Sequence, residues 1–176
     1  CWNPAGTHVA LGLESGFVEI ITNIGVTNES VSEFPLVAEN VKCRVDHMHW
    51  FDPQTIFIAM TVDAADEDED EDQVDALTES KCLIVTLSPD LLNVEAMYSA
   101  QDLFDSDSQV KPSYYTHYFE HWKLLTIVSS TSSQIEMIGQ VKGNTWSHIS
   151  SPTAISSFGS LPTNSSETEV YPVGAS

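Results

Sequence analysis

The 176-residue chain carries 26 acidic residues against six Lys and Arg residues, which gives a formal net charge of −20. Because nucleic acids and anionic membranes are themselves polyanions, this charge argues against both as direct partners and favours a partner with a basic surface. The length and a hydrophobic fraction of 41% are sufficient for a folded core. No apolar run approaches the roughly 20 residues that a membrane-spanning helix needs.

The first 22 residues predict antiparallel hairpins. A turn signal at Asn3-Pro4-Ala5-Gly6 precedes a strand expected over residues 7–13, and a second turn at Glu14-Ser15-Gly16 leads into a strand over residues 17–22. Each segment is about six residues long, rich in apolar residues and bounded by a turn, which is typical of strands rather than helices.

The same order of an aromatic residue, a turn and an apolar strand recurs twice, over residues 49–60 and more loosely over residues 118–128. Four-stranded units that recur every 40 to 50 residues or so indicate the blades of a β-propeller, because one blade cannot bury both of its faces alone. The fold class is therefore predicted to be all-β, a WD40-like propeller fragment of about three consecutive four-stranded blades.

The composition places the boundaries of these units. We expect them at the following residues: a partial blade at 1–44, a blade at 45–111 with an acidic insertion at 63–80, a blade at 112–150, a Ser/Pro/Thr-rich connection at 151–169 and the start of the next blade at 170–176.

The second unit opens with a segment over residues 45–51 that alternates Val45, His47, His49 and Phe51 on one face with polar and aromatic residues on the other. Residues 55–62 and 82–87 are nearly continuous apolar runs, as expected for paired strands buried on both faces. Residues 91–103 look amphipathic. Further strands are expected at 114–119, 123–129, 135–141 and 146–149.

The stretch between the two apolar runs contains seven consecutive carboxylates: Asp66, Glu67, Asp68, Glu69, Asp70, Glu71 and Asp72. Repulsion and desolvation keep such a run out of any packed core, so it is predicted to be a solvated loop. Two interpretations stay open: a solvated insertion without a role, or a polyanionic segment that steers a basic protein toward this one. The run lacks the glycine and the spaced ligands of an ordered calcium loop.

Candidate chemistry is sparse. His47 and His49 lie at i, i+2 on a strand, so both rings share a face, and Asp46, His117 and His121 are further potential metal ligands. The alternative is that these histidines fill half-buried positions. No phosphate-binding glycine loop, nucleophile elbow or HExxH motif is present. We expect no catalytic residue, metal or cofactor, and a metal-dependent propeller enzyme that uses His47 and His49 stays as a rival.

The remaining residues bear on compartment and packing. Cys1, Cys43 and Cys82 are odd in number and far apart, which favours reduced core thiols of an intracellular protein over a disulfide framework. Sequons at Asn28 and Asn164 keep an extracellular adhesion module open. Because the chain begins at Cys1 without an initiator Met or a signal-peptide pattern, we expect an excerpt of a longer protein. The tryptophans at 2, 50, 122 and 146 are interpreted as anchors of packing between blades.

A set of motifs follows in order along the chain: Cys1-Trp2-Asn3-Pro4-Ala5-Gly6 with Val9-Ala10-Leu11-Gly12 and Gly16; Asp46 to Trp50 with Ile56-Phe57-Ile58-Ala59; Leu83 to Pro89; Tyr114-Tyr115 and His117-Tyr118; Glu120-His121-Trp122 with Leu124-Leu125; Ser129 to Ser133; Ile135-Glu136; Trp146; and Pro172-Val173-Gly174. This ordered set resembles the N-terminal β-propeller of the large cytoplasmic-face FG nucleoporin of the nuclear pore complex, the CAN family.

This resemblance implies a seven-bladed ring that is not an enzyme and that acts at the cytoplasmic face of the nuclear pore complex. Its implied partners are the DEAD-box RNA helicase of mRNA export and other nucleoporins, with helicase and RNA in competition. The family uses charged rim loops for contact, so the implied contact residues are the acidic run 66–72 and Lys142, the base nearest to the third unit's inner strands. A generic WD40-type scaffold for another partner remains the alternative.

Overall fold

A computed structural model describes residues 1–25, 29–38, 41, 43–63, 78–100, 103, 112–132, 135–141 and 145–149. The chain divides into two compact units, Cys1–Asp107 and Ser108–Ser176. In the described residues the chain is all-β, with a single short 3-10 helix and no α-helix.

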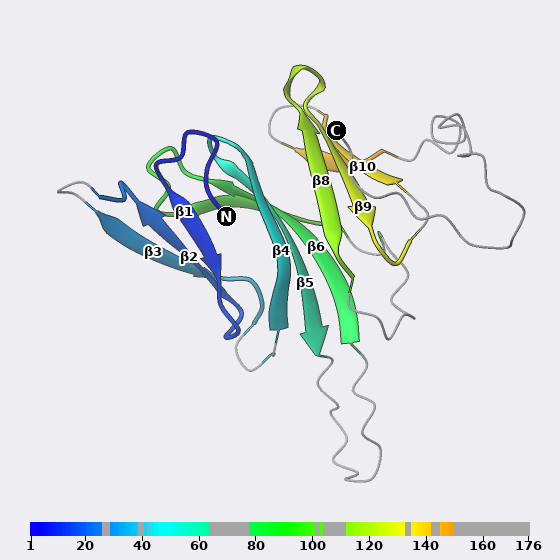
Figure 1. Cartoon of the computed structure of the whole chain (residues 1–176), viewed down its shortest axis with the longest axis horizontal. Helices are drawn as coiled ribbons and strands as arrows, with labels where there is room; N and C mark the ends of the chain where they lie inside the picture. Colours follow the sequence, from blue (N-terminus) through cyan, green and yellow to red (C-terminus); the bar gives the residue numbers. More distant parts are fainter. Residues whose placement is uncertain are drawn as a thin grey trace, which may run out of the picture. The chain divides into compact units, whose positions relative to one another are not determined.

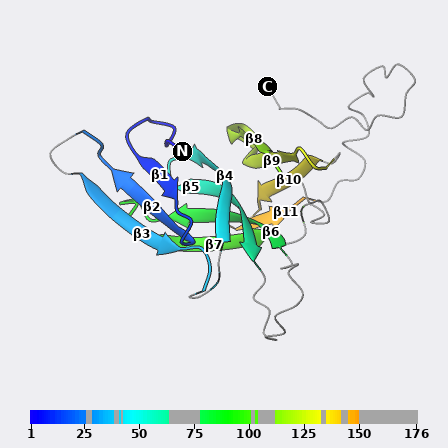
Figure 2. The same ribbon diagram turned by 60° about the horizontal axis from the view of Figure 1, so that its bottom comes forward.

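The described strands form three antiparallel sheets (Figures 1 and 2). The first sheet has the order β1-β2-β3 and contains β1 (Val9–Gly12), β2 (Phe17–Thr22) and β3 (Ser30–Pro35). The second sheet has the order β4-β5-β6-β7 and contains β4 (Cys43–Asp52), β5 (Thr55–Asp63), β6 (Thr78–Leu87) and β7 (Val94–Ala100). The third sheet has the order β11-β10-β9-β8 and contains β8 (Tyr114–Phe119), β9 (Leu124–Ser129), β10 (Ile135–Gln140) and β11 (Trp146–His148).

The turns of the first sheet follow the predicted signals. The side-chain carbonyl of Asn3 accepts the backbone N–H groups of Thr7 and His8 at 2.8 and 3.0 Å, and Gly6 donates to the Asn3 carbonyl at 3.0 Å. In the next turn Gly16 adopts φ +81°, a left-handed conformation that glycine reaches without steric cost. Both predicted turns are confirmed.

The second sheet is built around the β5–β6 hairpin, whose register runs from Thr55↔Thr86 to Asp63↔Thr78. The expected pairing of the two apolar runs is therefore confirmed. Residues 56–60 of β5 and 82–87 of β6 are all buried, as continuous apolar patterning requires.

The predicted alternation along β4 is wrong at its start. The register shifts between Val45 and His47, where Val45 pairs with Met60 but His47 already pairs with Ala59. This β-bulge places one extra residue on β4, so Val45 packs with Met48 and Trp50 on the core face and not with the two histidines.

The core of the first unit lies between the first and second sheets, which face each other in Figure 2. Alternate residues of β2 and β5 meet there, because a strand sends every second side chain to the same face. Gly12 of β1 allows close approach: a Cβ at this position would lie 2.8 Å from the Cβ of Val45. The buried members of this core are Ala10, Val18, Ile20, Leu36, Cys43, Trp50, Ile56, Ile58, Met60, Val62, Leu83, Val85, Leu87 and Leu91.

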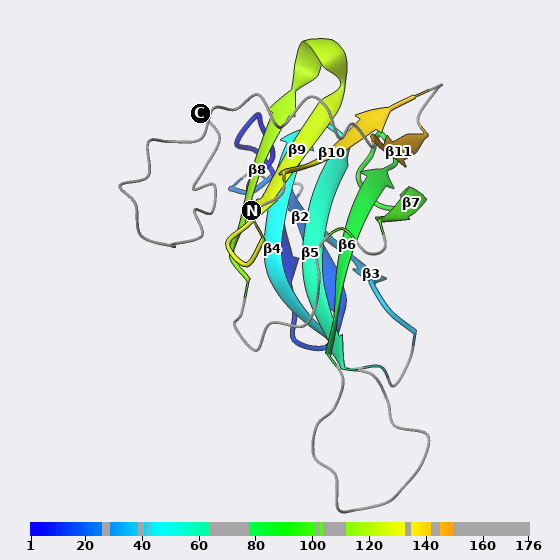
Figure 3. The same cartoon turned by 90° about the vertical axis from the view of Figure 1, so that its right-hand side faces the viewer.

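The third sheet is a four-stranded meander of its own. Its cross-strand rows include Tyr118↔Leu125↔Ile138, in which both aliphatic side chains are fully buried. The 3-10 helix η1 (Glu120–Trp122) connects β8 to β9 at the end of their hairpin, which Figure 3 shows from the side.

The all-β prediction is confirmed; of the described sheets, two have four antiparallel strands, as predicted for blades, and the first has three. The seven-bladed ring stays a prediction. Residues 151–169 and 170–176, the expected connection and next strand, lie outside the described residues.

Candidate protein-binding site

The acidic stretch is attached to one end of the second sheet. The β5–β6 ladder continues to the pair Asp63↔Thr78, so residues 64–77 leave and re-enter the sheet between these two positions. This stretch contains eight acidic residues and no Lys or Arg. A large negative charge is therefore joined to the fully paired β5–β6 hairpin.

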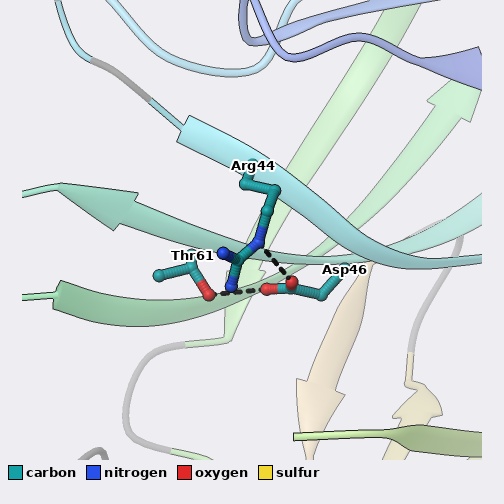
Figure 4. A network of polar contacts seen from close by, with 3 residues as sticks. All are labelled: Arg44, Asp46 and Thr61. Carbon is teal, nitrogen blue, oxygen red and sulfur yellow. Dashed lines mark hydrogen bonds and ion pairs between the residues drawn. The ribbon is translucent and has the colours of Figure 1, made fainter. Parts of the chain in front are cut away.

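A buried carboxylate lies close to this end (Figure 4). Arg44 donates from Nε to Oδ1 of Asp46 at 2.9 Å, and Thr61 donates from Oγ1 to Oδ2 at 2.5 Å. The side chain of Asp46 has no solvent exposure, whereas that of Arg44 is 53% exposed. Thr61 is the cross-strand partner of Arg44, and Asp46 lies at the β-bulge between Val45 and His47. The two donors offset the cost of burying the charge.

A second ion pair neutralises the other described base in this region. Lys81 Nζ lies 3.0 Å from Glu79 Oε2, and Glu79 pairs with Val62 next to the end of the ladder. Pairs of this kind at the surface contribute little stability, about 0–1 kcal/mol. The two ion pairs matter here for the local charge. Because Arg44 and Lys81 are each paired with a carboxylate of their own strand, they do not neutralise the negative charge of residues 64–77.

The predicted contact residues lie outside the described residues: Asp66, Glu67, Asp68, Glu69, Asp70, Glu71, Asp72 and Lys142. The structure describes only their points of attachment. On either side of residues 142–144, the Val141 N–H donates to the carbonyl of Thr145 at 2.9 Å, and the Val141 side chain is 62% exposed.

The histidines contact aromatic rings. The His47 ring centroid lies 6.2 Å from that of Phe57, the His49 centroid 6.0 Å from that of Phe51, and the His117 centroid 4.5 Å from that of Phe119. Desolvation by burial, followed by repulsion from His49, lowers the pKa of His47 below its ordinary value.

No group of three or more His, Cys, Asp or Glu residues that could hold a metal ion occurs in the part of the chain that the structure describes. Asp46, the nearest potential ligand in sequence, is bound to Arg44 and Thr61. The metal-dependent enzyme stays an untested rival.

The four tryptophans separate into two kinds. Trp50 and Trp146 are 2% and 4% exposed, and Trp50 belongs to the core between the first two sheets, as expected of a packing anchor. Trp2 and Trp122 are 57% and 68% exposed. Trp122 is the functional candidate that the sequence interpretation missed; its position in a four-residue turn between two strands was the available signal.

No family model matches the chain, and no curated protein matches it. The described part contains no helix with the length and apolar character needed to cross a membrane.

Proposed function

We propose that this chain is part of a nucleoporin β-propeller at the cytoplasmic face of the nuclear pore complex. It serves as a protein-binding platform for the DEAD-box RNA helicase of mRNA export, alongside other nucleoporins. The ordered motifs from Cys1 to Gly174 support the family, and three successive antiparallel sheets are compatible with consecutive blades. The face-to-face core between the first two sheets is the kind of packing that stacked blades need.

The partner class is supported above all by where the acidic charge is joined to the fold. The segment 64–77, with its eight carboxylates, joins the fold at the end of the β5–β6 hairpin. The two basic residues described nearby, Arg44 and Lys81, form ion pairs with Asp46 and Glu79. A helicase surface that binds RNA must carry basic side chains that contact the phosphates. Carboxylates compete with the phosphates for these side chains through charge-assisted hydrogen bonds, so the helicase binds either the platform or RNA but not both at once.

The acidic segment acts mainly on the rate of association. Long-range attraction between opposite charges raises the association rate constant by about 10-fold to 1,000-fold, and salt screens it over about 8 Å at physiological ionic strength. Short-range contacts from the rim loops then set how slowly the complex dissociates.

Stopped-flow binding of the complete propeller to the helicase tests this proposal. Replacing Asp66 to Asp72 by Ser and Gly is expected to lower the association rate constant by at least about 10-fold at low salt and to leave the dissociation rate nearly unchanged. The salt dependence of association is expected to flatten in the same variant.

A matched pair of variants separates location from net charge. Asp68→Asn/Asp70→Asn removes two charges from the acidic segment, and Glu33→Gln/Glu95→Gln removes two exposed charges from the strands β3 and β7. The first pair is expected to slow association more than the second. Equal slowing by both pairs would show that the acidic segment acts only through its contribution to the net charge. Absence of any helicase binding would favour the alternative of a generic WD40-type scaffold.

A further inference from the structure

The turn between β8 and β9 is short and carries an exposed tryptophan, Trp122. Phe119 and Leu124 are the last cross-strand pair, and η1 fills the connection. Lys123 then adopts φ +50°, which lets its N–H donate to the Glu120 carbonyl at 3.3 Å. The Lys123 carbonyl accepts the N–H of Gln140 at 3.0 Å, so β10 also holds this turn in place.

The Trp122 ring packs against the aromatic side chain of Phe119 from β8. Its ring centroid lies 5.5 Å from that of Phe119, with the planes tilted by 35°, and Phe119 is in turn 4.5 Å from His117 in an edge-to-face arrangement. Trp122 nonetheless remains 68% exposed, the largest exposed fraction among the large hydrophobic side chains of the described residues. A preorganised and exposed Trp is a typical anchor of a protein interface, because it buries a large area at a low entropic cost.

The charges around this ring favour a cation. Glu120 lies in the same helical turn and is exposed to solvent. Lys123, the neighbouring base, directs its Nζ to a point 5.9 Å from the Tyr118 ring centroid, so an intramolecular cation–π contact already engages it. Because Lys123 is engaged in this way, the exposed Glu120 is the charged group of the turn that attracts a basic segment.

We propose that Trp122 and Glu120 form a docking point for an arginine-bearing segment of a basic partner protein. A guanidinium stacks on the free face of the Trp122 indole, and the Glu120 carboxylate binds the same or a neighbouring arginine. Arginine fits better than lysine because its planar, weakly hydrated group stacks on aromatic faces and pairs with carboxylates. The identity of that partner as the helicase rests on the proposed function; the arginine-binding chemistry does not.

Fluorine NMR of the chain labelled with 5-fluorotryptophan tests the chemistry directly. The acidic segment also attracts basic peptides, so a local signal is needed, and Trp→Phe variants assign each of the four resonances. On titration with acetyl-(Gly-Arg)5-amide, the Trp122 resonance is expected to shift and the resonance of Trp2, which is 57% exposed, to shift much less.

The citrulline peptide acetyl-(Gly-Cit)5-amide keeps the planar group without its charge and is expected to leave Trp122 unmoved. Glu120→Gln is expected to weaken the shift about two- to threefold at a given peptide concentration. A Trp122 resonance that does not respond to the arginine peptide, or that responds equally to the citrulline peptide, would overturn the proposal.

Helicase binding to the complete propeller then distinguishes the two proposals. Trp122→Ala is expected to weaken binding by about fivefold or more, with partial retention in Trp122→Phe and no change in the matched control Trp2→Ala. If Trp122→Ala binds the helicase as tightly as the native protein does, the proposed helicase platform is supported, but Trp122 is not one of its contacts with the helicase. If the native protein does not bind the helicase but Trp122 still responds to arginine, the docking point stands and its partner is another basic protein.

Discussion

Gly12→Ala tests the close packing of the first sheet on the second. The Cβ of an alanine at this position would lie 2.8, 2.8 and 2.9 Å from the Cβ, Cγ1 and Cγ2 of Val45. Real carbon atoms essentially never approach so closely, and rotation of Val45 about χ1 moves its methyl groups but not its Cβ. The clash is therefore relieved only by separation of β1 from β4.

The magnitude follows from two opposing terms. Overpacking of this kind costs about 1–3 kcal/mol of unfolding free energy. A Gly→Ala change also restricts the unfolded chain and stabilises the fold by about 0.4–1 kcal/mol where the backbone is compatible, and Gly12 is not among the described residues with positive φ. We expect Gly12→Ala to lower the free energy of unfolding by about 1–2 kcal/mol.

Urea unfolding followed by Trp fluorescence measures this change. Val45→Ala removes two of the three crowded atoms, so in the double variant the clash is partly relieved and a favourable coupling of about 0.5–2 kcal/mol is expected. Gly139→Ala is the matched control, because the nearest atom there is the mobile Cδ1 of Ile149 and its cost is expected to be smaller. Stabilisation by Gly12→Ala, or additivity of the two changes within about 0.5 kcal/mol, would refute the packing.

Three further predictions concern single side chains of the second sheet and are checked on the same protein. Asp46→Ala removes the acceptor of the hydrogen bonds from the Arg44 guanidinium and the partly buried Thr61 hydroxyl. It is expected to lower the free energy of unfolding, measured by urea titration, by about 1.5–3 kcal/mol. An unchanged midpoint would show that the network does not contribute to stability. Burial, and then the charge of His49, lowers the pKa of His47 below 6.5, so the unfolded chain binds this proton first as pH falls. The corresponding stability is complete above about pH 6.5 and is lost as pH falls through the lowered folded-state pKa; His47→Gln is expected to lose less stability between pH 7.5 and 5.5 than the native protein, and identical losses would contradict this. Burial raises the pKa of Cys82 to about 12, so a thiol reagent at pH 8 is expected to label the half-buried Cys1 but not Cys82 until the protein is denatured, whereas rapid labelling of Cys82 would contradict its burial.

The parts of the fold that local chemistry determines are predictable from the sequence. A turn such as Asn3 to Gly6 needs only residues within it, because Asn3 accepts the N–H groups a few positions later. Continuous apolar patterning likewise reveals the β5–β6 hairpin, since both strands are buried on both faces.

The features that depend on tertiary context are not predictable in this way. The bulge at Asp46 arises from pairing between β4 and β5, and no local pattern in residues 43–52 marks the extra residue. The position of Trp122 in a four-residue connection marks it as a turn residue, but its exposure depends on tertiary packing, because a tryptophan in a turn is equally compatible with burial against the neighbouring strands.

The candidate site combines both kinds of information. The charge of residues 66–72 and the motifs of the nucleoporin resemblance come from the sequence alone. The structure adds the paired hairpin to which this charge is joined and the carboxylates that form ion pairs with Arg44 and Lys81, because these depend on strand register and side-chain geometry.

Equilibrium binding of the complete propeller to the mRNA-export helicase, with and without competing single-stranded RNA, tests the central proposal most directly. The account predicts a complex that forms without RNA, weakens as RNA is added, and weakens as salt rises. Helicase binding that RNA leaves unchanged would contradict a shared basic surface. Absence of any complex at low salt would contradict the platform itself.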